Sequence, residues 1–349
     1  APTETYTLSL HDALPISGGH VRLGRCVRRV DRRGLLVRRI PFFLPMKDCP
    51  NRCVYCDQRT ITGHGVQPAP GEIRRALQGA VEPLETCFFG GSFTCQPMDR
   101  QEEYLEVAAQ APASSRIRIS THPLCVDPGI LDFLSRFPVR FLELGISSLE
   151  DKVLNLCNRG YTGATAVERV SLVTDSTWLV PGVQLMTGLP GQDPSSSLED
   201  IRVLAEIKGD RPMQLRIYPC LVLRGTPLEE LFLSGSYTPP GIDESARWAG
   251  RMIRKARESG FELLRVGLQE TASLGEGVVA GPHHPALGEL ARSYALALSL
   301  VHRARSGPWS VPLSYRSLLS GHGNWGFREL ASLSEIAIDE VKRLVTWTR

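Results

Sequence analysis

The stretch KDCPNRCVYCDQ, residues 47–58, places three cysteines, Cys49, Cys53 and Cys56, at the spacing C-x3-C-x2-C, and no fourth cysteine follows at a matching distance. It comes just after residues 39–44, RIPFFL, a run that is typical of a strand. Cubane iron–sulfur clusters held by protein alone take four thiolates. Three thiolates on one short loop would leave one iron open, and an open iron can bind and activate a small molecule.

Two other interpretations of the three cysteines stay open at this point. A structural zinc site requires four nitrogen or sulfur ligands, and the nearest fourth candidate downstream is His64, eight residues past Cys56. A disulfide would leave one cysteine over. The nine cysteines of the chain have irregular spacing and no secretion signal precedes them, which indicates a reducing cytoplasm.

The chain beyond the loop has the composition of a globular protein. Its 349 residues predict one α/β barrel with a smaller appendage. Hydrophobic content of 42% and charged content of 22% are ordinary, and no apolar run approaches the ~20 residues that span a bilayer, so no membrane partner is expected. The formal net charge of +3 neither establishes nor excludes nucleic acid as a partner.

The first residues need separate treatment. Residues 7–16, TLSLHDALPI, resemble the translation of a sequencing adapter, so residues 1–17 are expected to be non-native. Residues 18–37 form an arginine-dense leader. It is either a basic arm for RNA or upstream sequence read through into a gene that starts near Arg38, and the second interpretation is favoured.

From residue 38 to residue 270, short apolar runs alternate with amphipathic segments. Strands are expected at residues 39–44, 86–89, 116–120, 140–145, 183–187 and 214–218, with a further candidate at 261–268. Helices are expected at residues 72–81, 100–110, 128–137, 150–158, 165–174 and 197–208. This alternation predicts a parallel sheet with right-handed crossovers, and six units predict a partial (β/α)6 barrel. Residues 271–349 are expected to form a mostly helical C-terminal extension.

Small and polar residues mark the expected strand ends, where such folds bind ligands. Gly90, Gly91 and Ser92 follow the second strand, where two glycines serve either a turn or a close approach to a ligand. Arg159 begins a glycine-containing turn, so it could bind a carboxylate or cap the preceding helix. Gln184 would point its amide towards the same edge of the sheet.

Several blocks of the chain occur in the order and spacing of one family. They are CPNRCVYCDQRTITG, FFGGSFT, LELGISSLEDKVL with NRGYT, QLMTGLPG, RIYPCLVLRGTPLEELF and VVAGPHHPALGEL, and they run from about Pro41 to Leu290. Together they resemble the radical S-adenosylmethionine (SAM) portion of the Elongator catalytic-subunit family. The resemblance implies that Cys49, Cys53 and Cys56 hold a 4Fe–4S cluster, with SAM on its open iron.

The same resemblance implies roles for other residues. It assigns SAM binding to Tyr55, Gly90, Gly91, Ser92, Glu143, Arg159 and Gln184. It places on the substrate side His122, Tyr218, Arg224, Arg265 and Gln269. It further implies a low-potential electron donor of the flavodoxin or ferredoxin type, and tRNA as a partner.

The chain departs from the family in three places. Ser147 stands where the family has glutamine, and a shorter side chain loses reach to SAM. The sequence STHPL, with His122 and Leu124, replaces Ser-Thr-Arg-Pro-Asp and removes an arginine and a carboxylate from the substrate side. The glycine pattern of an acetyltransferase does not follow residue 290, so acetyl-CoA use is not implied.

Three hypotheses of function follow. The first is reductive cleavage of SAM and hydrogen abstraction from tRNA or another RNA. The second is the same chemistry on a small molecule, as in the related oxygen-independent coproporphyrinogen oxidases. The third is a non-catalytic protein that binds SAM and an iron–sulfur cluster.

Overall fold

A single curved sheet organises the chain. The computed structural model describes residues 27–30 and 36–349, so the predicted non-native segment and most of the predicted leader lie outside the described residues. The sheet has the order β1-β2-β3-β4-β5-β6-β7-β9, with β1 antiparallel to β2 and every other neighbouring pair parallel. Its strands are β1 (Val27–Val30), β2 (Leu36–Leu44), β3 (Leu84–Gly90), β4 (Arg116–Thr121), β5 (Val139–Ser147), β6 (Val180–Thr187), β7 (Gln214–Pro219) and β9 (Glu262–Val266).

The predicted partial barrel is confirmed, with one strand more than the six predicted. The further candidate at residues 261–268 forms β9, which pairs with β7 and completes seven parallel strands. The helices between the strands are α1 (Gln58–Thr62), α2 (Pro70–Leu77), α3 (Met98–Ala109), α4 (Pro128–Ser135), α5 (Asp151–Leu156), α6 (Gly163–Asp175), α7 (Pro194–Lys208), α8 (Pro227–Leu233) and α9 (Ile242–Glu258). Helix α7 begins three residues before its predicted start, because the Asp193 carboxylate accepts hydrogen bonds from the Ser195 and Ser196 backbone amides.

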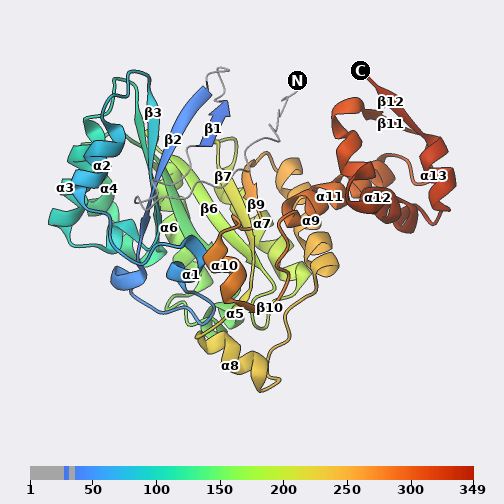
Figure 1. Cartoon of the computed structure of the whole chain (residues 1–349), viewed down its shortest axis with the longest axis horizontal. Coiled ribbons are helices and arrows are strands. Elements are labelled where there is room, and N and C mark those ends of the chain that lie inside the picture. The colour runs from blue at the N-terminus through green and yellow to red at the C-terminus, as the bar shows by residue number, and fades with distance from the viewer. Residues whose placement is uncertain (1–26, 31–35) are drawn as a thin grey trace.

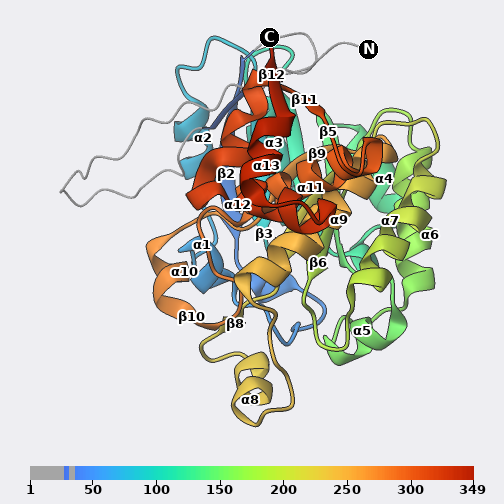
Figure 2. The same cartoon turned by 90° about the vertical axis from the view of Figure 1, so that its right-hand side faces the viewer.

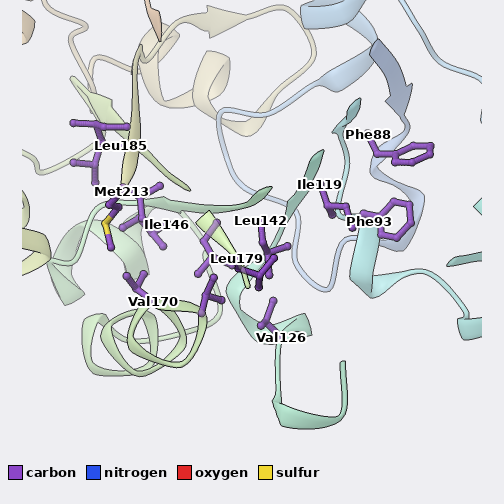
Figure 3. Close-up of a cluster of buried hydrophobic side chains, with 14 of the residues drawn as sticks. Phe88, Phe93, Ile119, Val126, Leu142, Ile146, Val170, Leu179, Leu185 and Met213 are labelled. Atoms are coloured by element: carbon purple, nitrogen blue, oxygen red, sulfur yellow. The ribbon is translucent and has the colours of Figure 1, made fainter. Parts of the chain in front are cut away.

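The hydrophobic core lies between the convex face of the sheet and the surrounding helices. Figure 3 shows part of this layer, with Phe88, Ile119, Leu142 and Leu185 from the successive strands β3 to β6. Phe88 lies beside Phe93 at one side of the view, and Val170 of α6 lies at the other. Residues on the opposite face of each strand point into the half-barrel, since side chains alternate along a strand. The concave face carries charged residues together with aromatic rings, such as Phe141, whose centroid lies 4.0 Å from the Arg118 guanidinium.

The elements that follow the strands gather at one end of the molecule. Helices α1, α5 and α10 (Ala272–Gly277) follow β2, β5 and β9, and they lie together at the lower end of Figure 1 with α8. The short strands β8 (Val222–Leu223) and β10 (Val278–Ala280) pair there. The domain boundary expected at residue 270 stays a prediction, and α10 and β10 beyond it pack against α1 and β8 of the barrel.

The C-terminal extension is mostly helical, as predicted. It comprises α11 (Leu287–Arg303), β11 (Trp309–Pro312), α12 (Arg316–Ser334), α13 (Ile338–Leu344) and β12 (Val345–Thr348). The strands β11 and β12 pair in parallel, and Figure 1 shows them with α12 and α13 beyond α9 and α11. In Figure 2 this group faces the viewer. Arg247 of α9 binds both carboxylate oxygens of Glu329 in α12, at 2.9 and 2.7 Å. Within the described ranges, no helix has both the length and the apolar character that crossing a membrane requires.

A disulfide joins Cys95 to Cys125, which the sequence did not predict. The two residues lie in short 3-10 turns, Phe93–Cys95 and Pro123–Cys125, after β3 and β4. Because β3 and β4 are neighbours, the turns bring the two Cα atoms to 5.1 Å, within the range that a disulfide spans.

A network of ion pairs fills the interior of the half-barrel. The fully buried guanidinium of Arg118 in β4 lies 2.6 Å from Glu85 of β3 and 2.5 Å from Glu143 of β5. Arg216 of β7 binds both oxygens of Glu143, at 2.6 and 3.0 Å. Burial alone would raise the pKa of Glu143, but the guanidinium groups of Arg216 and Arg118 outweigh burial and hold its pKa at about 2.

The substitution Glu143→Gln tests this network. It leaves two buried guanidinium groups without their shared carboxylate, so the free energy of unfolding should fall by roughly 3–5 kcal/mol. The pKa of Glu143 lies below its unfolded value of about 4.3, so the ion pairs stabilise the fold above that pH and this stabilisation is lost as the pH falls towards 2. Urea unfolding between pH 7 and pH 2 should show a smaller acid-dependent loss for Glu143→Gln than for the natural sequence.

A matched control is Glu199→Gln, which removes an exposed carboxylate that pairs with Arg202 on α7. This variant should unfold at nearly the same urea concentration as the natural sequence, because exposed pairs contribute little. Equal stability of the two variants would contradict a stabilising role for the network.

Candidate functional site

The three cysteines of the loop between β2 and α1 are free thiols. Their loop lies at the end of the sheet where α1, α5 and α10 gather (Figure 1). Ser92, in the loop after β3, brings its Oγ to 3.4 Å from Cys49 Sγ. Arg159, in the loop after α5, donates from Nη1 to Cys53 Sγ at 2.9 Å. Segments after three strands therefore meet at the cysteine loop, with Cys56 leading into α1.

Backbone hydrogen bonds fix this loop between α5 and α8. The Val54 amide donates to the Cys157 carbonyl at 3.2 Å, and the Leu228 amide donates to the Val54 carbonyl at 2.9 Å. The Asn158 side-chain amide donates to the Arg52 carbonyl at 2.9 Å. These hydrogen bonds hold the backbone on both sides of Cys53 in place. The loop that carries the three thiols is therefore fixed to the rest of the half-barrel.

The alternatives of zinc and of a disulfide find no support at this loop. His64, the fourth ligand that zinc would need, stacks on Phe43 of β2 with ring centroids 5.2 Å apart. Nowhere in residues 27–30 and 36–349 do three or more His, Cys, Asp or Glu side chains converge on one position for a metal ion. None of the three cysteines takes part in the disulfide between Cys95 and Cys125. A cubane cluster requires no such convergence, because each thiolate binds a different iron, so three free thiols on one loop fit its donor set.

Arg159, which the resemblance predicts to bind SAM, contacts Cys53 of the cysteine loop. Its Nη2 donates to the Tyr161 hydroxyl at 3.0 Å and also to the Gly145 carbonyl. Burial disfavours its charge, but Tyr161, Tyr55 and Cys53 more than offset burial and raise the pKa of Arg159 above its ordinary value. The side chain is therefore a fixed cation that stabilises negative charge on the Cys53 sulfur.

Cys56 is a thiol whose protonation opposes metal binding. Burial, followed by the neighbouring Cys53, raises its pKa to about 12. A metal must displace the proton of each thiol that it binds. The Gln58 side-chain amide lies 3.5 Å from the Cys56 sulfur and partly counters the effect of burial.

Tyr55, predicted to contact SAM, is buried and its hydroxyl lies 2.7 Å from Ser147 Oγ. Ser147 has a φ of +64°, in the left-handed region that few residues other than glycine adopt. Ser147, where the resemblance predicted glutamine, thus forms a hydrogen bond with Tyr55, the aromatic residue of the cysteine loop. The role of Tyr55 toward SAM stays a prediction.

The two glycines at the end of β3, Gly90 within the strand and Gly91 directly after it, have a local structural cause. Gly90 has a φ of +94°, and a Cβ on Gly91 would collide with the Pro45 carbonyl oxygen. The Gly91 amide donates to the Leu44 carbonyl at 2.8 Å. Glycine is therefore required so that the end of β3 can press against the start of the cysteine loop, which positions Ser92.

Glu143 and Gln184, also predicted to contact SAM, lie inside the half-barrel. Both carboxylate oxygens of Glu143 bind guanidinium groups of the half-barrel. The carboxylate is therefore engaged within the protein, whereas the prediction required it to contact SAM. Gln184 donates to Glu143 at 3.1 Å and to Ser120 at 2.7 Å. Arg118 and Arg216 were not predicted, although polar residues alternate with apolar ones along β4 and β7, which was a usable signal.

His122 lies in the turn after β4 with its ring edge-on to Tyr161 at 5.1 Å. Its Nδ1 accepts a hydrogen bond from the Leu124 amide at 3.3 Å. Burial, with a further contribution from Arg159, lowers the pKa of His122 to about 3. The imidazole is therefore neutral at physiological pH and lies beside the Arg159–Tyr161 pair.

The remaining residues of the predicted substrate side divide into two groups. Tyr218 of β7 and Arg265 of β9 are half-buried, and pairing of Arg265 with Arg216 in the sheet register puts it on the concave face. Arg224 and Gln269 are exposed in loops beyond β8 and β9. The structure therefore brings Tyr218 and Arg265 together and leaves the other two at the rim.

Two family profiles match the chain in succession. Residues 43–204 match the Radical SAM superfamily, and residues 212–295 match the Radical SAM C-terminal domain. The first match contains the cysteine loop and the second contains β7, β9 and the start of α11.

Curated relatives and a solved structure agree with these matches. The chain is 27% identical over 183 residues to the tRNA uridine(34) acetyltransferase of Methanocaldococcus jannaschii, covering 46% of this chain and 34% of the relative. It is 29% identical over 194 residues to Elongator complex protein 3 of Drosophila melanogaster, covering 49% and 35%. The chain thus spans about a third of the length of these relatives.

The archaeal Methanocaldococcus infernus Elp3, with an N-terminal deletion, has a similar fold, with a TM-score of 0.55 and 21% sequence identity. The similarity covers 75% of this chain and 63% of that one. The cysteine loop, the half-barrel and both profile matches give one conclusion: the chain carries a radical SAM domain and belongs to the radical SAM superfamily, with Elongator-like relatives.

Proposed function

We propose that this protein is a radical SAM enzyme whose Cys49, Cys53 and Cys56 hold a 4Fe–4S cluster. The observation that supports the proposal is the fixed loop at the carboxyl edge of the half-barrel, which carries three free thiols. Arg159 donates a hydrogen bond to one of them, Cys53. Proteins of this superfamily bind a 4Fe–4S cluster and SAM. When bound, the pair supplies the one-electron cleavage of SAM that starts hydrogen abstraction from a substrate.

The surrounding residues of this chain would prepare the loop for that cofactor. Arg159 offsets part of the negative charge that thiolates bring to a buried site, through its contact with Cys53. Ser92 places a hydroxyl beside Cys49. The concave face of the sheet, where most charged side chains are paired with one another, forms the wall that would exclude water from the reacting atoms.

We further propose that the substrate is tRNA. The support is the curated relative whose name states an action on tRNA uridine 34. Two arginines at the rim are exposed. Arg224, after β8, donates its backbone amide to the Gly277 carbonyl of α10, and Arg59 of α1 precedes Thr60, the residue that lies against Gly277. Neither arginine forms an ion pair within the part of the chain that the structure describes, so both are available for phosphate groups.

An electron donor would reach the cluster from the outer side of the cysteine loop. Lys47 and Arg52 of that loop and Lys152 of α5 are exposed, and none has an ion-pair partner among residues 36–349. Lys47 and Lys152 are two of the five lysines of the chain, and the hydrogen bond from Asn158 to Arg52 joins the end of α5 to the cysteine loop. An acidic flavodoxin or ferredoxin is the partner that this charge favours.

The enzyme class is tested by the formation of 5′-deoxyadenosine. The full chain, reconstituted without oxygen, should produce it from SAM and dithionite, and Cys53→Ala should produce none because the loop loses a cluster ligand. The matched control is Cys87→Ala, a buried free cysteine of β3, which should keep its iron content and activity. Absence of product from the natural sequence would leave the non-catalytic hypothesis.

Binding of tRNA is tested by its dependence on salt. The double variant Arg59→Gln/Arg224→Gln should weaken tRNA binding and reduce the slope of log affinity against log salt by roughly 0.7–0.9 for each phosphate that is no longer neutralised. The exposed Arg257→Gln of α9 is the charge-matched control and should leave the slope unchanged. Binding that is absent or independent of salt would contradict tRNA and leave a small molecule as the substrate.

The donor surface is tested by comparing two reductants. In Lys47→Glu/Lys152→Glu, the ratio of flavodoxin-supported to dithionite-supported 5′-deoxyadenosine formation should fall roughly tenfold at low salt, because the steering charge is reversed. Lys255→Glu, on α9, serves as the control and should preserve the ratio. A ratio that the double variant does not change would place the donor elsewhere.

A further inference from the structure

Most arginines of the concave face bind a carboxylate. Arg39 of β2 lies 2.8 Å from Glu85, and Arg118 contacts both Glu85 and Glu143. Arg216 of β7 contacts Glu143 at 2.6 Å. Buried charges are tolerated when they are paired in this way, so each of these guanidinium groups has its countercharge within the network, although Arg118 Nη2 has no hydrogen-bond partner among the described residues.

Arg265 differs from these arginines. It lies next to Arg216 in the register of β7 and β9, so it shares the concave face, and its Nε donates to the Gly267 carbonyl at 3.1 Å. It forms no ion pair with any described residue. Burial lowers the pKa of Arg265; Tyr218 partly opposes this effect, and Arg216 adds to it.

The position of Arg265 points it towards the site. Gly267, which accepts its hydrogen bond, lies beyond it at the carboxyl end of β9. Tyr218, beyond Arg216 on β7, interacts with both arginines. The Arg265 side chain stays partly exposed, and its Nη groups have no hydrogen-bond partner among residues 36–349. The Nη1 and Nη2 groups of Arg265 are therefore donors available to a ligand at the carboxyl end of the half-barrel.

We infer that Arg265, with Tyr218 beside it, binds an anionic group of the substrate, a phosphate or a carboxylate. This inference rests on the proposed radical SAM function, because it names the class of substrate that enters the same half-barrel. A guanidinium binds either anion through two parallel hydrogen bonds, and the phenol adds a third donor. The bound anion would supply the charge that Arg265 lacks.

Arg265 is a different cation from the one at the cysteine loop. Arg159 follows β5 and contacts Cys53, whereas Arg265 belongs to β9 and lies beside Arg216 of β7. SAM must reach the open iron at the cysteine loop, and Arg159 is the cation there. Arg265 is therefore assigned to the anionic group of the substrate, and Arg159 to the site of SAM.

Titration calorimetry of the full, cluster-reconstituted chain saturated with SAM tests this assignment. Inorganic phosphate and succinate serve as the two probes, and the stronger binder identifies whether the anion is a phosphoryl or a carboxylate group. Arg265→Gln should lower the affinity for that probe at least tenfold. Arg265→Lys keeps the charge but loses the two parallel hydrogen bonds, so its affinity should lie between those of Arg265→Gln and the natural sequence. Arg257→Gln should match the natural sequence.

The affinity for SAM, measured by equilibrium dialysis, should stay within twofold in all variants. Two results would overturn the inference: unchanged affinity for both anions in Arg265→Gln, or a loss of SAM affinity as large as the loss of anion affinity. Formation of 5′-deoxyadenosine in the same preparation is a separate readout. If it fails while anion binding still depends on Arg265, the proposed function is wrong and the anion site stands.

Discussion

The pairing of Glu143 with Arg118 and Arg216 is the constraint around which the half-barrel is arranged. One carboxylate on β5 binds guanidinium groups on β4 and β7, so it ties together strands that are not all neighbours in the sheet. A buried charge tolerates little displacement, because each shift of a strand would leave it unpaired. The network therefore fixes which residues of each strand face inward, and with them the position of every loop at the carboxyl edge.

The site is built on this frame by contacts between loops. Arg159 connects the segment after β5 to the cysteine loop, and Gly91 lets the segment after β3 press against the same loop. Arg159 and Gly91 both lie in loops, outside any helix or strand. Both contacts depend on the parallel order of the strands, which places the ends of β2, β3 and β5 at one edge.

The parallel strands of the half-barrel and the three cysteines could be predicted from the sequence, because alternation of apolar runs and the spacing C-x3-C-x2-C are local patterns. Prediction failed where partners lie far apart in the chain. The contacts of Glu143 with Arg216 and of Tyr55 with Ser147 span 73 and 92 residues, so no local pattern indicates them. The bond between Cys95 and Cys125 was missed for the same reason, since only the adjacency of β3 and β4 brings those turns together.

That bond has a consequence for how the protein behaves while it works. Its two half-buried cysteines join the turn behind Ser92 to the turn that holds His122, yet the chemistry proposed for the neighbouring loop demands a strong reductant. Thiol reductants open accessible disulfides. Thr94 and Thr121 join the same two segments by a 2.6 Å bond between their hydroxyls, which no reductant breaks. The two turns therefore keep a non-covalent tie under the conditions in which the cross-link is reduced.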